Sequence, residues 1–172
     1  MEGEGEVTFL DDEEVFAVII AIAVVGSVLG AAMILRSSSG EKFGAIGLLD
    51  DQCKIGNYPA AAVNGTEVNL CLFVYNHYGE PAYFKVEYKI GDNSTLPTNS
   101  TASPLHELKE WRVILNNNEN ATFPISVPVY AAVGTGEEKA LIFELWIYNL
   151  SDQSWEYSGL WTDLYINITG VR

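Results

Sequence analysis

The chain has 172 residues and a net charge of −14, and 48% of its residues are hydrophobic. Half of that net charge lies in residues 1–14, which hold seven acids and no Lys or Arg. This balance excludes a phosphate-binding surface, so nucleic acid is not expected as a partner. We interpret residues 1–14 as an acidic N-terminal tail, either solvated or docked on a basic partner beside a membrane.

Residues 15–35 form an uncharged apolar segment, whose length of about 30 Å at 1.5 Å per residue matches the hydrocarbon core of a bilayer. A cleavable signal peptide would carry a basic region before a shorter apolar stretch, and no Lys or Arg precedes this one. The segment predicts a transmembrane helix in contact with membrane lipid. Small residues stand four apart in it, which either permits close helix packing or reflects their abundance in membrane helices; these are Gly26 with Gly30, and Ser27 with Ala31.

Six Asn-X-Ser/Thr sequons follow the apolar segment, and random placement would give roughly one or two. Each is an acceptor for N-glycosylation, which requires a segment that has crossed the membrane. The acceptors are Asn64, Asn93, Asn99, Asn120, Asn149 and Asn167. They predict an internal N-terminus and an extracellular C-terminal domain carrying N-linked glycans. The positive-inside rule favours the reverse, because Arg36 and Lys42 follow the helix, but long domains translocate largely regardless of charge.

Residues 36–42 are interpreted as a short polar linker, and residues 43–172 as one domain large enough to bury its own core. The chain has two cysteines, Cys53 and Cys71, with 17 residues between them. Outside the cell, a disulfide between them would stabilise the fold by about 3 kcal/mol. The alternative is a pair of buried free thiols.

Beyond the linker, apolar residues alternate with polar ones, as in half-buried strands. Turn residues separate the runs, and Pro124 and Pro128 suggest an edge position for one of them. The most apolar run, residues 140–149, is predicted to be central. The predicted strands are 43–49, 67–75, 82–90, 108–115, 121–129, 140–149, 155–157 and 160–168. About seven strands with turns every 8–12 residues predict an all-β, immunoglobulin-like β-sandwich ectodomain behind one N-terminal transmembrane α-helix.

Two of these strands, 67–75 and 82–90, are predicted to form a hairpin around a turn at residues 76–81. In the first strand, one face carries Val68, Leu70, Leu72 and Val74. In the second, Phe84, Val86, Tyr88 and Ile90 should face inward, and Tyr83, Lys85, Glu87 and Lys89 outward. The polar segment 91–104, with two sequons, is expected to be an exposed loop coated with sugar.

Candidates for catalysis are few, and the sequence predicts a non-enzymatic protein without a catalytic, cofactor or metal site. Asp50 and Asp51 are adjacent acids of the kind that is usually solvated. His77 falls in a predicted turn. No nucleophilic residue lies at a spacing from His106 that would indicate a catalytic motif. Three further acids could offer oxygen ligands to Ca²⁺ but form no EF-hand pattern, namely Asp92, Asp152 and Asp163.

The four tryptophans leave two interpretations open: Trp111, Trp146, Trp155 and Trp161. Exposed rings could stack on sugars. Alternatively, Trp146 fills the core, and the others cover an open end of the sandwich or a partner surface, which is the interpretation that we prefer.

Three segments carry a resemblance to a known family: Gly56-Asn57-Tyr58-Pro59, the strand end Val74–Gly79, and the strand Tyr83–Tyr88. Together they resemble the archaeal membrane-protein family catalogued as domain-of-unknown-function family 1616, whose pattern has Glu where this chain has Tyr78. The resemblance covers about residues 44–170. It implies an archaeal, membrane-anchored, extracytoplasmic β-sandwich with no assigned chemistry. Many members carry several membrane helices, whereas this chain shows one such segment.

These observations together lead to the expectation of a single-pass membrane protein that is an accessory or structural subunit of a membrane or cell-envelope assembly. Its partners would be other membrane or envelope protein subunits. One alternative is a surface module that recognises glycans or an envelope partner through exposed Trp. Another is a filament subunit assembled by strand addition, although no pilin-type basic cleavage site precedes the apolar segment.

Overall fold

The computed structural model describes residues 13–36, 41–130 and 137–170, and the chain divides into two units, residues 1–40 and 41–172. In the first unit, helix α1 (Glu13–Arg36) is long and apolar enough to cross a membrane. Its large apolar side chains between Phe16 and Met33 are exposed. A Cβ added at Gly26 or Gly30 would meet nothing within 4 Å, so both glycines lie on an open helix surface. One N-terminal helix able to anchor the chain is therefore present.

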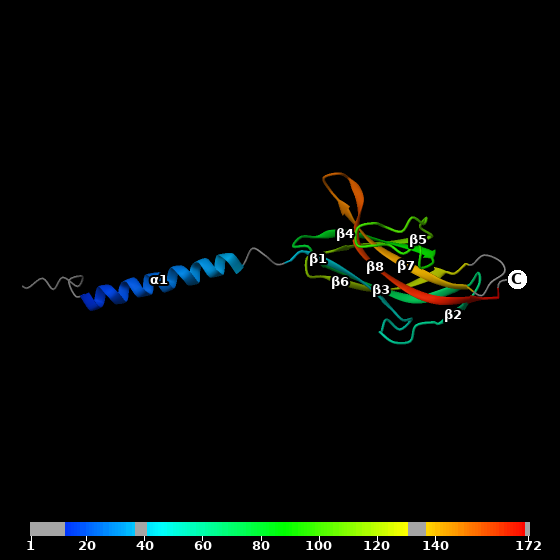
Figure 1. Cartoon of the computed structure of the whole chain (residues 1–172), viewed down its shortest axis with the longest axis horizontal. Coiled ribbons are helices and arrows are strands. Elements are labelled where there is room, and N and C mark those ends of the chain that lie inside the picture. Colours follow the sequence, from blue (N-terminus) through cyan, green and yellow to red (C-terminus); the bar gives the residue numbers. More distant parts are fainter. Residues whose placement is uncertain (1–12, 37–40, 131–136, 171–172) are drawn as a thin grey trace, which may run out of the picture. The chain divides into compact units, whose positions relative to one another are not determined.

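The second unit is a β-sandwich of two sheets, which confirms the predicted fold class (Figure 1). The three-stranded sheet has the order β1 (Phe43–Leu49), β3 (Glu67–His77), β6 (Asn120–Pro128). The five-stranded sheet has the order β2 (Ala61–Val63), β8 (Ser154–Thr169), β7 (Glu137–Asn149), β4 (Ala82–Gly91), β5 (Lys109–Leu115). All neighbouring strands are antiparallel except β2 and β8, which run parallel.

The core lies between the inner faces of the two sheets, as the alternation of apolar residues predicts. On β3, Leu70, Leu72 and Val74 are at most 1% exposed, and on β4 Phe84 and Tyr88 are fully buried. Burial of such side chains contributes about 1.5–3 kcal/mol each. The Tyr88 hydroxyl crosses the core and donates a hydrogen bond to the Pro128 carbonyl of the opposite sheet at 2.8 Å.

The predicted hairpin between residues 67–75 and 82–90 is wrong, because β3 and β4 belong to different sheets. The chain changes sheets at Asn76, which is fully buried. Its side-chain amide donates to the carbonyls of Glu80 and Leu115, each at 2.9 Å, and its side-chain oxygen accepts from the Tyr78 amide. These bonds satisfy a buried corner that would otherwise leave polar groups unpaired. A turn composition alone does not tell a corner from a hairpin.

Other strand predictions are confirmed or refined. As predicted, β6 is an edge strand and β7 is the central strand of its sheet. The two predicted strands 155–157 and 160–168 form the single strand β8, whose register against β7 shifts between Leu145 and Trp146. Gly159 lies at this shift with a φ of 78°, a conformation that favours glycine. The short strand β2 was not predicted from the sequence.

Candidate functional site

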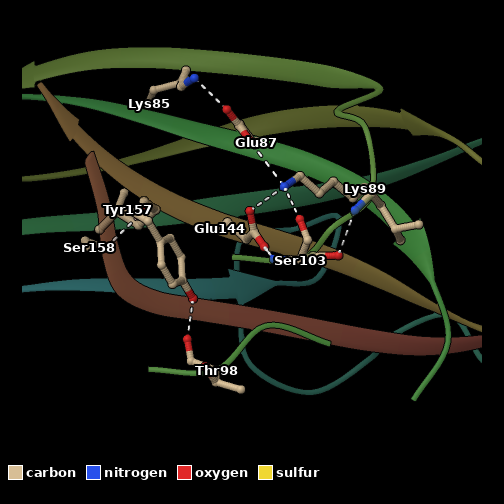
Figure 2. A network of polar contacts seen from close by, with 10 residues as sticks. Lys85, Glu87, Lys89, Thr98, Ser103, Glu144, Tyr157 and Ser158 are labelled. Atoms are coloured by element: carbon tan, nitrogen blue, oxygen red, sulfur yellow. Dashed lines mark hydrogen bonds and ion pairs between the residues drawn. The ribbon is translucent and has the colours of Figure 1, made fainter. Parts of the chain in front are cut away.

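The outer face of the five-stranded sheet holds a row of charged side chains that is buried. Lys85, Glu87 and Lys89 of β4 and Glu144 of β7 are 8%, 7%, 4% and 0% exposed, respectively. They point away from the core, as predicted for the β4 residues. Residues 92–108, which we call the cover loop, contribute Ser103 to this cluster (Figure 2). We call the outer surface of β4, β7 and β8 beneath this loop the covered face.

The charges on the covered face alternate in sign and form a chain of ion pairs. Lys89 Nζ lies 2.7 Å from Glu144 Oε2 and 3.4 Å from Glu87 Oε2. Lys85 Nζ lies 2.5 Å from the other oxygen of Glu87. Burying a charge without a partner costs free energy, so the cover loop could not bury these side chains if they were unpaired.

The main chain of the cover loop completes the network. The Ser103 amide donates to Glu144 Oε1 at 2.5 Å, and Lys89 Nζ donates to the Ser103 carbonyl at 3.1 Å. Further along, the Tyr157 hydroxyl donates to the Thr98 carbonyl at 3.0 Å (Figure 2). A Cβ added at Gly159 would collide with the Asn99 backbone, so the missing side chain of this glycine lets the loop approach β8.

The expectation of a fully exposed loop at residues 91–104 is therefore wrong in part. Pro97 and Ser103 are buried against the sheet, whereas Asn93 and Asn99 are exposed. The polar composition of this loop reflects hydrogen bonds to buried charges as well as contact with water. Its sequons still project outward.

Two carboxyl groups meet where the cover loop ends. Burial opposes ionisation of Glu87, but its hydrogen bonds with Lys85 and Glu107 and the nearby lysine charges outweigh burial, so the pKa of Glu87 is lowered. The hydrogen bond with Glu87 raises the pKa of Glu107, and burial and the negative charge of Glu87 add to this effect. Glu107 is thus the less acidic member of a carboxyl pair that joins the cover loop to β4.

Aromatic side chains surround one end of the covered face. Lys85 Nζ lies 5.2 Å from the ring centroids of both Trp146 and Trp155, a cation–π arrangement. The ring of Trp155 contacts Tyr83 at an angle of 55° and Tyr148 at 68°. These tilted rings form an edge-to-face cluster and no flat platform of the kind that would favour stacking on a sugar.

The preferred placement of Trp146 in the sandwich core is wrong. The residue stands two positions from Glu144 on β7, so both side chains point outward, and the Trp146 ring contacts Lys85 and Tyr157. All four tryptophans are half-buried, and among them Trp111 packs against the core. The indole nitrogen of Trp146 is buried and makes no hydrogen bond within the described residues.

The outer face of the three-stranded sheet is apolar at one end. Phe73, Tyr75 and His77 follow one another at alternate positions of β3, and we call these three side chains the aromatic ridge. The Tyr75 and His77 rings are stacked at 14°, and Phe43 of β1 lies 4.9 Å from the His77 ring. Neighbouring positions on β1 and β6 carry short side chains, since Ala45 and Asn120 are both partners of Tyr75. We call this outer surface the open face.

The other end of the open face is closed by residues 50–57. Cys53 in this segment and Cys71 on β3 form a disulfide with a Cα–Cα distance of 5.1 Å. Asp50 is 3% exposed, and its Oδ1 accepts hydrogen bonds from the amides of Gln52 and Lys54 at 3.0 and 2.8 Å. The bond from the Lys54 amide in particular lowers the pKa of Asp50. Asp50 thus shapes this loop, and Asp51 beside it is exposed.

A hollow of about 740 Å³ lies at the end of the sandwich beside the β7–β8 hairpin. Two of the most exposed apolar side chains in the unit line it, Ile114 at 68% and Leu150 at 81% exposed. Pro81, Tyr83, Ile147 and Tyr148 add further apolar or aromatic surface, and Lys42 and Glu80 are the charged residues of the lining. Hairpin β7–β8 projects beyond the neighbouring strands (Figure 1). We call this feature the apolar hollow.

The structure places the predicted glycosylation sites at different parts of the sandwich. Asn64 and Asn149 are half-buried, and the other four are exposed: Asn93, Asn99, Asn120 and Asn167. Asn149 differs because its amide nitrogen donates to Asp152 Oδ2 at 3.0 Å and to Glu156 Oε1 at 2.7 Å. Both of its amide hydrogens are thus engaged in this conformation.

The residues considered for catalysis or metal binding do not assemble. Within the described part of the chain, no group of three or more His, Cys, Asp or Glu side chains could hold a metal ion. His77 contacts the Asn118 side chain, and His106 is exposed. Asp92 begins the cover loop, where the Ser94 hydroxyl lowers its pKa, while Asp152 and Asp163 lie in the β7–β8 turn and in β8.

Sequence reasoning missed Glu144 and Ser103, which hold the cover loop in place. Glu144 had a recognisable signal, because it is the one charged residue in the apolar run from Ala140 to Tyr148. A lone acid in a central strand requires a buried partner. Ser103 had none, because it takes part through its backbone.

No protein-family model matches this chain, and no curated protein matches it. Among solved structures, a Listeria innocua β-glucosidase bound to isofagomine is similar at 8% identity and a TM-score of 0.43, covering 77% of this chain and 17% of that one. Escherichia coli α-2-macroglobulin is similar at 16% identity and a TM-score of 0.44, covering 74% of this chain and 17% of that one. The CARDB domain of a Pyrococcus furiosus protein, solved with di-metal ions, is similar at 11% identity and a TM-score of 0.42, covering 74% and 89%. The chain thus spans a small part of the first two proteins, and all three likenesses concern the arrangement of strands.

Proposed function

We propose that this chain is a non-enzymatic, single-pass membrane protein whose β-sandwich lies outside the cell and contacts another subunit of a membrane or cell-envelope assembly. Helix α1 anchors it, and the apolar hollow receives the partner. The resemblance to family 1616 supports the same location and remains a prediction. The chemistry of the occupant is that of a protein segment with apolar side chains.

The single observation that carries this proposal is the exposure of Ile114 and Leu150 beside the apolar hollow, at 68% and 81%. Isolated exposed apolar residues are ordinary, but here they share one concavity with Pro81, Tyr83, Ile147 and Tyr148. Interfaces are enriched in such aromatic and apolar residues and depleted of charge at their centre. Ile114 lies on β5, which is an edge strand of the five-stranded sheet. A partner can therefore approach it from the open side of the sheet.

The sequon at Asn149 lies on the rim of the apolar hollow, and a sugar there would obstruct it. In the proposed assembly Asn149 stays unmodified, because Asp152 and Glu156 occupy its amide group. Sugars on the other sequons would leave this surface accessible.

Co-purification from native membranes in mild detergent tests the proposal. We expect Ile114→Arg to abolish recovery of the partner subunits that the wild-type chain carries, because a long charged side chain would replace apolar contact in the interface and would have to be desolvated. The matched control is Val63→Arg, which changes a residue that is 54% exposed on β2, outside the hollow. Equal recovery of the same subunits with both variants would rule out the hollow as the interface.

Location is tested separately, by adding protease to intact cells and by mass spectrometry of glycopeptides. We expect the β-sandwich to be accessible and sugars to be absent from Asn149. A protected, sugar-free domain would contradict the extracellular placement, whatever the result for Ile114.

Recognition of glycans through exposed tryptophans is less well supported. Trp155 and its neighbours Tyr83 and Tyr148 are half-buried and mutually tilted, and Lys85 occupies the space between Trp146 and Trp155. The aromatic cluster is thus largely saturated by the protein's own contacts.

A further inference from the structure

We propose that an N-linked glycan on Asn120 lies over the aromatic ridge and covers the open face. This inference rests on the extracellular location proposed above. It assigns to one sequon a structural role and to the open face a definite occupant, the first sugars of a glycan attached to the same chain.

The strand register brings the attachment point beside the ridge. Asn120 is exposed at the start of β6 and is the direct cross-strand partner of Tyr75. Direct partners in an antiparallel sheet project from the same face with Cβ atoms about 5 Å apart. Next along the strands, Thr122 of the same sequon faces Phe73. A sugar attached to Asn120 therefore starts directly beside Tyr75 and diagonally across from Phe73.

Neighbouring side chains leave that side of the ridge free for a sugar. Phe43 packs on the β1 side, at 5.8 Å from the Tyr75 ring and 4.9 Å from the His77 ring. On the β6 side, both Tyr75 and His77 direct a polar atom to the Asn118 side chain, and Asn120 and Thr122 are short. The ring surfaces on this side thus meet no bulky side chain from β6.

The chemistry of a pyranose ring suits this surface. Its C–H groups form an apolar face that can pack on the negative face of an aromatic ring, while its hydroxyls stay in water. Tyr75 has an apolar ring with a polar end, and such side chains are frequent where one side of a contact is wet. The contact would shield Phe73 and Tyr75 without requiring a second protein.

The other sequons lack this arrangement. Asn93 is approached by Tyr165 through its hydroxyl, which donates to the Asn93 side chain at 3.3 Å. The register partners of Asn167 are Ala61 and Glu138, neither of them aromatic. Asn99 belongs to the cover loop, and Asn149 is engaged by carboxylates. Asn64 follows β2 of the five-stranded sheet, and its backbone amide donates to the Thr169 carbonyl. Of the six sequons, only Asn120 therefore has its acceptor on the open face.

The test compares two variants purified from native membranes. Thr122→Val removes the Asn120 sequon with little change in shape, and Thr122→Ser keeps it. We expect iodination of Tyr75 to be at least threefold faster in Thr122→Val, because the ring loses its cover. The thermal midpoint should also fall by about 3 °C relative to Thr122→Ser, of the order produced by loss of one surface contact in a domain of this size.

Thr101→Val is the matched control, because it removes the Asn99 sequon on the other sheet. It should leave the iodination rate of Tyr75 unchanged. The same comparison is repeated in chains that also carry Tyr75→Thr, which gives a double-mutant cycle. In that background, loss of the Asn120 sugar should lower the thermal midpoint by less than half as much as it does when Tyr75 is present. Equal Tyr75 rates in both Thr122 variants would overturn the inference.

Glycopeptide analysis separates this failure from that of the proposed function. Sugars on other sequons with Asn120 bare would overturn the inference and leave the extracellular location intact. A sandwich without sugar on any of the six Asn residues and protected from external protease would overturn both.

Discussion

The two outer faces of the sandwich are closed in different ways. The covered face buries Lys85, Glu87, Lys89 and Glu144 under the chain's own cover loop, whereas the open face carries the aromatic ridge and is capped at one end by a disulfide-linked loop. The difference follows from side-chain chemistry. Buried charges require specific partners in a fixed geometry, which a folded segment supplies, while apolar rings accept any occupant of suitable shape.

This comparison also separates stability from interaction. The covered face is saturated by contacts within the chain, so changes there should alter folding. The open face and the apolar hollow keep exposed apolar surface, and changes to that exposed surface should alter what the protein carries or binds. The predictions below test what each face contributes to stability, in order of decreasing effect.

The largest effect is expected for Glu144→Leu. This change leaves Lys89, which is 4% exposed, without its closest ion-pair partner, and it removes the acceptor for the Ser103 amide. Breaking a buried pair in this way should lower the free energy of unfolding by about 3–5 kcal/mol, measured by urea denaturation.

The matched control is the double variant Lys89→Met with Glu144→Leu. It should recover part of the lost stability, because replacing both partners by apolar side chains leaves no charge uncompensated. The rest stays lost, since the Ser103 amide and carbonyl no longer have these side-chain partners. A Glu144→Leu variant as stable as the wild-type chain would mean that the cover loop is not fastened through this residue.

A smaller loss is expected on the open face when the disulfide is removed. Cys53→Ala with Cys71→Ala should lower the free energy of unfolding by about 3 kcal/mol, because the unfolded chain is no longer constrained between positions 18 apart. Amide hydrogen exchange should then accelerate at Lys54 and Asn57, whose amides bind Asp50.

Exchange at the Ser103 amide is the internal control for this variant, since it belongs to the covered face. It should not change under conditions where the protein stays folded. Parallel loosening at Ser103 would show that the two faces are coupled through the core and do not act independently.

The sequence allowed the strands and their inward residues to be predicted, because alternation is a local signal. Phe84, Val86 and Tyr88 are buried as expected, and Pro124 correctly indicated an edge strand. Strand pairing was less accessible. At the buried corner that sends β3 and β4 into different sheets, the Asn76 side chain donates to carbonyls of residues up to 40 positions away.

The two outer faces were hard to predict for a related reason. Lys85 and Lys89 were correctly placed outward, yet their burial depends on the cover loop, which contacts them through the Ser103 backbone. Trp146 was misplaced because it lies in the most apolar run of the chain, although its position two residues from Glu144 puts it on the outer face. The alternation of side chains along the strand decides which face Trp146 occupies, and the apolar character of the side chain does not.

The smallest effect is expected at the carboxyl pair that joins the cover loop to β4. The pKa of Glu107 is raised in the folded protein, first by its hydrogen bond with Glu87. Folding therefore disfavours ionisation of Glu107. The free energy of unfolding falls for this reason as the pH rises from the ordinary pKa of a glutamate through the raised pKa of Glu107. Glu107→Gln should raise the free energy of unfolding by about 0.5 kcal/mol at pH 7, a value suited to an exposed side chain, and by nothing at pH 3.

Glu138→Gln, with the same change of charge at an exposed position of β7, should give no comparable gain. Urea denaturation at both pH values measures the difference, and an equal gain from Glu107→Gln at pH 3 and pH 7 would show that the pair does not respond to ionisation of Glu107.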